Sequence, residues 1–233
     1  MMKNFKKFTA LLLALCMVFS LSISAFAVED HEHTVYESAP DEEIAVQSVS
    51  GEAATSGTIP GSSIKWSLDS KGWLTISGSG AMNDCVFQWG DPDPRPWSAY
   101  LSEIKTVVIG DSITKIGKES FSSLSCTTVR IGKNVQVIGE NAFMNCTSLT
   151  GDLVIPDSVT TIDRWAFFGS VISNGTLTLG KGLRTIGERA FTDCSFSGGL
   201  TIPEGVTEIA EGAFCSSSKY SGSPAHGKIN GTL

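Results

Sequence analysis

The chain carries one short pattern of hydrophobic and polar positions five times between residues 107 and 214. Each copy has two apolar residues at alternate positions, a stretch of turn formers, a second apolar pair three residues apart, and then a phenylalanine. The copies begin at Val107, Val129, Leu153, Leu177 and Leu200, so successive starts lie 22, 24, 24 and 23 residues apart. Spacing this regular predicts a repeat fold.

The elements of one copy follow from its periodicity. Alternating apolar residues predict a short strand with one buried face. The next residues, such as Pro156-Asp157-Ser158, favour a turn because Pro restricts φ and Asp bonds its own backbone. One such unit cannot enclose a core, whereas stacked units align equivalent side chains in ladders, and each strand pairs with the next. The predicted ladders are Val107, Val129, Leu153, Leu177 and Leu200, and Phe121, Phe143, Phe167, Phe191 and Phe214.

The repeat resembles that of the BspA-like leucine-rich-repeat family of bacterial surface proteins in two stretches, Ile138–Cys146 (IGENAFMNC) and Leu153–Val159 (LVIPDSV). The resemblance covers residues 104–217, and residues 66–82 are similar to the strand-rich leader before such repeats. It implies a β-rich solenoid of leucine-rich-repeat type in a secreted or cell-surface protein that binds or adheres, and it does not imply catalysis.

The segments outside the repeats have separate signatures. Residues 1–27 combine three lysines, an apolar run and an Ala-Phe-Ala end, which predicts a secretory signal peptide. Residues 28–60 hold eight acids and no Lys or Arg, and we expect a disordered acidic spacer. Residues 61–103 form the predicted β-rich N-terminal cap, which covers the apolar end of the first repeat. The Leu74-x-Ile76 alternation predicts a strand of a capping hairpin.

The predicted solenoid spans residues 104–218, and residues 219–233 are a flexible tail or the start of a truncated repeat. The second alternative arises because the sequence of Ile229–Leu233 resembles that of Ile172–Leu177, which leads into a repeat strand. We therefore expect either a small secreted protein or a chain that stops inside a longer array.

Charge and composition narrow the partners. The formal charge is −7, and the predicted solenoid and cap are nearly neutral because residues 61–233 hold 14 bases and 16 acids. This balance argues against nucleic acid as a partner. Three His and no Cys/His cluster argue against a zinc enzyme, and no cofactor is expected. We expect no membrane insertion once the signal is removed, and the oligomeric state stays open.

Five cysteines follow the predicted signal, an odd number that leaves at least one unpaired in a monomer. Cys146 and Cys194 occupy one repeat position two copies apart, which places them beyond the reach of a disulfide. We expect both to be buried apolar fillers. A bridge between Cys194 and Cys215 stays open, and the states of Cys85 and Cys126 are not predicted.

Two motifs suggest chemistry. Gly110-Asp111-Ser112 is similar to the nucleophile block of GDS-type esterases, but the same repeat position holds Pro156-Asp157-Ser158, which favours a turn. The expected Asp before the C-terminal His226 is absent, since Ser223 stands there. His31 and His33 allow two interpretations: a weak metal-binding site, or two histidines that simply belong to the disordered acidic spacer. We predict no catalytic, cofactor-binding or metal-ligating residue.

Three features suggest a binding surface. Trp89 and Trp97 bracket a proline-rich loop, and the alternative is that they hold the loop against the cap core. Trp165 occupies a repeat position that otherwise holds Glu119, Asn141, Arg189 and Gly212, so we expect it, with Phe168, to face solvent unless it packs locally. The outward positions of the first strands form a row: Val108, Arg130, Val154, Thr178 and Thr201.

These features predict non-catalytic binding or adhesion to an extracellular protein or polysaccharide. The alternative is a structural module that scaffolds a larger cell-wall assembly, and a GDS-type esterase is a distant third.

Overall fold

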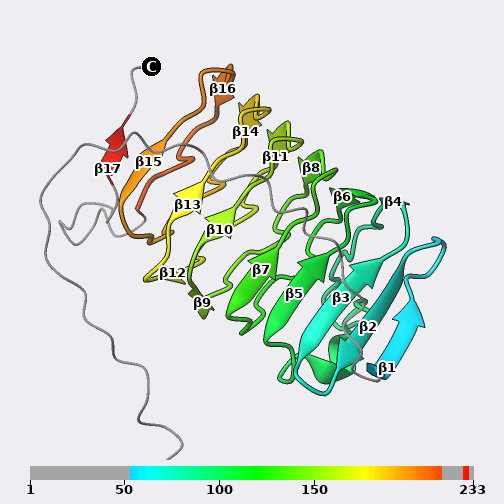
Figure 1. Cartoon of the computed structure of the whole chain (residues 1–233). Coiled ribbons are helices and arrows are strands. Elements are labelled where there is room, and N and C mark those ends of the chain that lie inside the picture. The colour runs from blue at the N-terminus through cyan, green and yellow to red at the C-terminus, as the bar shows by residue number, and fades with distance from the viewer. Residues whose placement is uncertain (1–52, 217–227, 231–233) are drawn as a thin grey trace, which may run out of the picture. The chain divides into compact units, whose positions relative to one another are not determined.

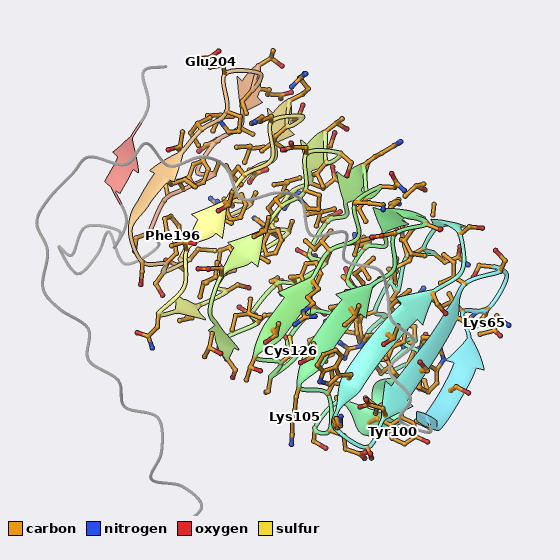
Figure 2. All side chains as sticks on the ribbon, viewed as in Figure 1. Lys65, Tyr100, Lys105, Cys126, Phe196 and Glu204 are labelled. Carbon is orange, nitrogen blue, oxygen red and sulfur yellow. The ribbon has the colours of Figure 1, made fainter. Side chains whose placement is uncertain are left out.

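The computed structural model describes residues 53–216 and 228–230. The predicted signal peptide, most of the predicted spacer and most of residues 217–233 lie outside the described residues. Rows of short β-strands follow one another from the cap toward Glu204 (Figures 1 and 2). The one helical element among the described residues is a 3-10 turn, η1 (Ser98–Tyr100), in the cap.

The cap contributes three strands to a five-stranded sheet, and its capping hairpin is confirmed. Strand β2 (Lys65–Asp69) pairs antiparallel with β3 (Trp73–Ser77), with Trp66 opposite Ile76. Leu74 and Ile76 are buried, as their alternation predicts. Strand β3 then pairs in parallel with the first repeat strand, so the cap continues directly into the solenoid.

The outer cap strand corrects one expectation. Strand β1 (Ala53–Thr58) pairs antiparallel with β2, although these residues fall in the segment predicted to be a disordered spacer. The strand has no alternating apolar residues because it lies at the sheet edge and is held by backbone hydrogen bonds. Its Gly57 also makes room for a ring, since a Cβ there would lie 2.6 Å from Trp66 Nε1.

The repeats build two main rows of parallel strands (Figure 1). Equivalent residues are in register along each row, as in Val107↔Val129 and Leu153↔Leu177. The first row is β5 (Thr106–Ile109), β7 (Thr128–Arg130), β10 (Leu153–Val154), β13 (Leu177–Thr178) and β15 (Gly199–Thr201). The second row is β4 (Gly80–Ala81), β6 (Ile113–Ile116), β8 (Val137–Ile138), β11 (Thr161–Ile162), β14 (Thr185–Ile186) and β16 (Glu208–Ile209).

Two further pairings complete the sheets. Strands β9 (Leu149–Thr150) and β12 (Ile172–Ser173) pair in parallel on a third side of the stack. Strand β17 (Lys228–Asn230) pairs in parallel with β15, with Ile229 opposite Leu200. This register is the one that neighbouring repeats use, so Ile229 follows Leu200 in the strand ladder.

The phenylalanine ladder runs through the core and is confirmed. Its rings stack at centroid distances of 5.2 to 5.3 Å with nearly parallel planes. Trp97 adds a rung at the cap end, 5.4 Å from Phe121, and its side chain is 0% exposed. Trp97 is therefore wrong as a candidate for the binding surface. It occupies the position of the cap in the ladder, where burial of the indole in the apolar core is more favourable than its exposure to water.

The turn before and after each phenylalanine uses left-handed backbone at two positions. The first comprises Glu119, Asn141, Trp165, Arg189 and Gly212, and the second comprises Ser123, Asn145, Gly169 and Asp193; their φ values lie between 52° and 70°. The backbone N–H groups at both positions donate to carbonyls of the following repeat, as from Trp165 to Glu188 at 2.9 Å. Glycine and asparagine adopt this conformation most easily. The turn geometry therefore requires left-handed backbone at both positions, whichever residue stands there.

The cysteines within the described residues are unbridged. Cys146 is buried, as expected, and its thiol donates to the Phe121 carbonyl at 3.3 Å. Cys194 is half-buried rather than fully buried, and its thiol donates to the Phe167 carbonyl at 2.9 Å. Desolvation raises the pKa of the Cys194 thiol to about 12, so it remains protonated at neutral pH.

Candidate binding surfaces on the cap and the repeats

The cap loop, residues 86–95, is attached to the first repeat near both ends. Before the loop, the Cys85 N–H donates to the Lys118 carbonyl at 2.8 Å. The Phe87 N–H donates to Glu119 Oε2 at 2.9 Å. At the far end, the Arg95 Nη1 donates to the Ser122 carbonyl at 2.7 Å. The loop is thus pinned by one backbone contact and two side-chain contacts to the neighbouring turn.

Arg95 is the central anchor of this loop. Its side chain is only 6% exposed and forms an ion pair with Asp93 at 2.6 Å. Its Nε also donates to Asp93 Oδ1 at 3.0 Å, which gives the fork geometry that strengthens an arginine–carboxylate pair. Partial burial favours a higher pKa for Asp93, but the hydrogen bonds from Arg95 outweigh it and lower the pKa.

The anchored loop presents apolar groups to solvent. Val86 is 49% exposed, Phe87 is 40% exposed and Trp89 is fully exposed. The Arg95 guanidinium lies 5.0 Å from the centroid of the Phe87 ring, a cation–π contact that holds this ring against the loop. Trp89 is therefore exposed to solvent, and Phe87 is exposed beside it. The sequence signal for Phe87 was an apolar pair, Val86 and Phe87, in a stretch without strand periodicity.

Trp89 lies at the tip of a tight turn. The Asp91 N–H donates to the Gln88 carbonyl at 3.2 Å, which closes a four-residue turn around Trp89 and Gly90. Gly90 has φ of 91°, the conformation that a type II turn requires at its third residue. The turn fixes the direction in which the Trp89 backbone projects, and the indole has solvent around it.

Trp165 differs from the exposed aromatic that the sequence predicts. It is half-buried, with the Arg164 guanidinium 3.9 Å from its ring centroid and Phe168, also half-buried, at a ring distance of 6.3 Å. Its left-handed φ of 56° and a buried Nε1 without a hydrogen-bond partner are both local costs. Local contacts therefore cover part of the ring. The polar residues at the equivalent position of the other repeats reflect the left-handed turn geometry and not a solvent-facing side chain.

The outward row of the first strands is solvent-facing over four repeats. Arg130, Val154, Thr178 and Thr201 are exposed, and Val154 reaches 54%. Val108 is half-buried, and the Arg130 guanidinium lies 5.3 Å from the centroid of the Trp73 ring. The cap loop contacts the turn at Glu119, and Trp165 holds the equivalent turn position two repeats further along. The strand row lies on β7, β10, β13 and β15, so the predicted residues come from different parts of the repeat.

The serine motif has a structural role. Asp111 Oδ1 accepts the Lys133 N–H at 3.0 Å, and Asp157 Oδ1 accepts the Lys181 N–H at 2.7 Å in the equivalent turn. The aspartate therefore joins one repeat to the next. The histidines at 31, 33 and 226 lie outside the described residues, as does the weak metal-binding site that His31 and His33 would form. Within the described ranges, no cluster of three or more His, Cys, Asp or Glu is arranged to hold a metal.

Over residues 53–216 and 228–230, no helix has the length and apolar character needed to cross a membrane.

Comparison with known families identifies the repeats. The sequence model described as "BspA type Leucine rich repeat region" matches residues 114–222 in six copies, one more than the five repeats predicted from the pattern. No curated protein is significantly similar to the chain.

Two crystal structures are similar to the chain. A leucine-rich repeat protein from Eubacterium ventriosum is 29% identical with a TM-score of 0.53; the alignment covers 67% of this chain and 40% of that protein. A leucine rich cell surface protein from Faecalibacterium prausnitzii is 18% identical over 70% of this chain and 74% of that protein. Its TM-score of 0.24 is too low to support an argument. The chain thus spans less than half the length of the Eubacterium protein.

Proposed function

We propose that the protein acts outside the cell as a non-catalytic binding or adhesion protein. The chain belongs to the BspA-type leucine-rich-repeat family, whose sequence model matches residues 114–222. The predicted signal peptide at residues 1–27 supports the location. Repeat proteins of this kind use extended surfaces for recognition. The turn role of Asp111 supports a non-catalytic function because it accounts for the motif that most resembled a nucleophile site.

The observation that carries this proposal is the cap loop. Exposing large apolar side chains to water is unfavourable, and a partner that covers them lowers the free energy. Three of the five exposed large hydrophobic residues in the described part of the chain are Val86, Phe87 and Trp89. The Arg95 anchor holds their backbone in place before a ligand arrives, which reduces the entropy lost on binding.

The test is attachment of the full mature chain to an array of extracellular matrix proteins and polysaccharides. We expect the double variant Phe87→Ser, Trp89→Ala to reduce attachment by about tenfold or more while leaving the melting temperature nearly unchanged. Ile209→Thr is the matched control, since it removes an exposed apolar group from β16. No attachment by the parent chain would overturn the proposal.

The same array separates the alternatives. Loss of attachment in Val154→Asp, with full attachment in the loop variant, would assign binding to the strand row instead. Retention of the chain in isolated cell walls without attachment to any arrayed ligand would favour the scaffolding function. Neither result would be consistent with a binding site at the cap loop.

A further inference from the structure

The cap loop contains an unusual tryptophan for this protein. Trp66 and Trp97 are buried in the core, and Trp73 and Trp165 are half-buried beneath arginine side chains. Trp89 alone among the five is fully exposed, and a Cβ built on the adjacent Gly90 would meet no atom within 4 Å. A ligand can therefore approach the indole without displacing any described part of the chain.

The size of the exposed patch constrains the partner. A stable protein interface typically uses about 20–30 residues on each side around an apolar core. The cap loop offers three apolar side chains, and Phe87 is partly covered by Arg95. A single free aromatic face flanked by polar groups matches instead a pyranose ring, whose C–H face stacks on an indole while its hydroxyls form hydrogen bonds. Gln88 and Asp91, both exposed, flank Trp89 in the turn.

Charge determines which glycan fits. Asp91 and Asp93 lie within the loop, and Asp84 and Glu119 lie at its base. The pKa of Asp84 is lowered, chiefly by the Lys118 N–H that it accepts, so this carboxylate is ionised at neutral pH. A sulfated or uronic acid polymer would meet these carboxylates.

The neighbouring cations compensate only part of this negative charge, and each of them is already paired with a carboxylate. Arg95 is occupied by Asp93 and by the Ser122 carbonyl. Lys115 pairs with Asp84 at 3.0 Å, and Lys118 pairs with Glu140 at 3.0 Å. An anionic ligand would have to break one of these pairs to gain a counter-charge, whereas an uncharged one would leave them intact.

We infer that Trp89, at the tip of the cap loop, is a stacking platform for a neutral polysaccharide, with Gln88 and Asp91 as hydrogen-bonding partners for its hydroxyls. This inference rests on the binding function proposed above for the same loop and names the class of ligand. Arg95 acts as a positioning residue, because it holds the loop through the Ser122 carbonyl without reaching the exposed indole.

The experiment titrates the full mature chain with a β-glucan, an α-glucan and a mannan, and with polygalacturonate and chondroitin sulfate as anionic counterparts. Tryptophan fluorescence and affinity electrophoresis report binding. We expect at least one neutral polysaccharide to shift the emission to shorter wavelength and to protect the chain from acrylamide quenching, because Trp89 is the fully exposed indole. The anionic polymers should bind at least about tenfold more weakly.

The variants locate the contact. Trp89→Ala should weaken neutral glycan binding by about tenfold or more, whereas Trp89→Phe should retain part of it because the ring is kept. Arg95→Lys should weaken binding and broaden the quenching response of Trp89, since a lysine cannot reproduce the fork. Ile209→Thr should bind like the parent.

Three results would overturn the inference and can be told apart. If the chain attaches to an arrayed protein, or to an anionic glycan, but to no neutral polysaccharide, the ligand class is wrong while the binding function stands. If neutral glycan binding is unchanged in Trp89→Ala, Trp89 is not the stacking platform, while the binding function stands. If the parent chain attaches to nothing, both proposals fail.

Discussion

The segment that leads into the ladder residue has two forms in this molecule. In the repeats it is a tight turn, as from Gly117 to Phe121, in which the N–H groups of Glu119 and Phe121 donate to carbonyls of the next repeat. In the cap it is the longer loop of residues 86–95, and the carboxylate of Glu119 accepts the Phe87 N–H. Both forms deliver a ring to the same stack, Phe121 in one case and Trp97 in the other.

The difference shows how a repeat protein gains a specialised surface. The ladder requires only that an aromatic ring arrives at the correct position, so the chain before it can be lengthened without disturbing the core. The added residues must then find their own hydrogen bonds, and Arg95 together with Asp93 supplies them. The repeats maximise contacts along the stack, and the cap loop exposes apolar groups away from it.

The largest expected effect comes from breaking the ladder at its centre. Phe167→Ala removes a fully buried ring stacked on both sides and should lower the free energy of unfolding by about 3–5 kcal/mol. Phe214→Ala should cost less because Phe214 is half-buried and stacks on Phe191. Denaturant unfolding of both variants measures the difference. Equal shifts would show that the ladder is not coupled along the stack.

The next effect concerns the loop anchor. Arg95→Ala should lower the free energy of unfolding by about 1–3 kcal/mol, because it leaves the Ser122 carbonyl without a charged donor in a buried position. Proteolysis within residues 86–95 should accelerate while Trp97 fluorescence stays that of a buried ring. A variant that is as stable as the parent and equally resistant would show that the loop does not depend on this contact.

The same anchor predicts a pH dependence. The pKa of Asp93 is lowered in the folded chain, so the stability from its ion pair is present above the unfolded value of about 3.9. That contribution is lost as pH falls through the folded pKa. Asp93→Asn should therefore be less stable than the parent at neutral pH and approach it in acid. Thermal unfolding of both proteins from pH 7 downward checks the sign, and a constant gap would contradict it.

A smaller effect separates backbone strain from function. Arg189 has φ of 52° in the left-handed position of its repeat, where asparagine is easily accommodated, as at Asn141. Arg189→Asn should raise the free energy of unfolding by about 1 kcal/mol. Asn141→Ala should lower it, because alanine loses the local preference for that conformation. A destabilised Arg189→Asn would mean that the contacts of the arginine outweigh the strain.

The smallest effect belongs to the strand row. Val154→Thr replaces one β-branched residue with another at an exposed position beside Thr178, so the free energy of unfolding should change by no more than about 0.5 kcal/mol. A larger loss would show that Val154 is covered in solution by something that the isolated chain supplies.

Repeat periodicity made much of this fold predictable. The strand positions, the Phe167 ladder and the role of Asp111 in a turn all follow from positions that recur, since one repeat serves as a control for another. The candidate site was less predictable. Trp89 could be singled out, but the cap offers one copy of its loop, and nothing in the sequence distinguished it from the buried Trp97.

The repeat pattern alone requires that apolar residues align along a stack, because each unit is too short to bury its own apolar face. The folded chain was needed to show which turn positions are left-handed, which tryptophan enters the ladder and which remains in solvent. Those outcomes depend on hydrogen bonds between residues distant in the chain, such as Phe87 to Glu119 and Arg95 to Ser122. A local pattern carries no information about such partners, because their proximity exists only after the repeats have stacked.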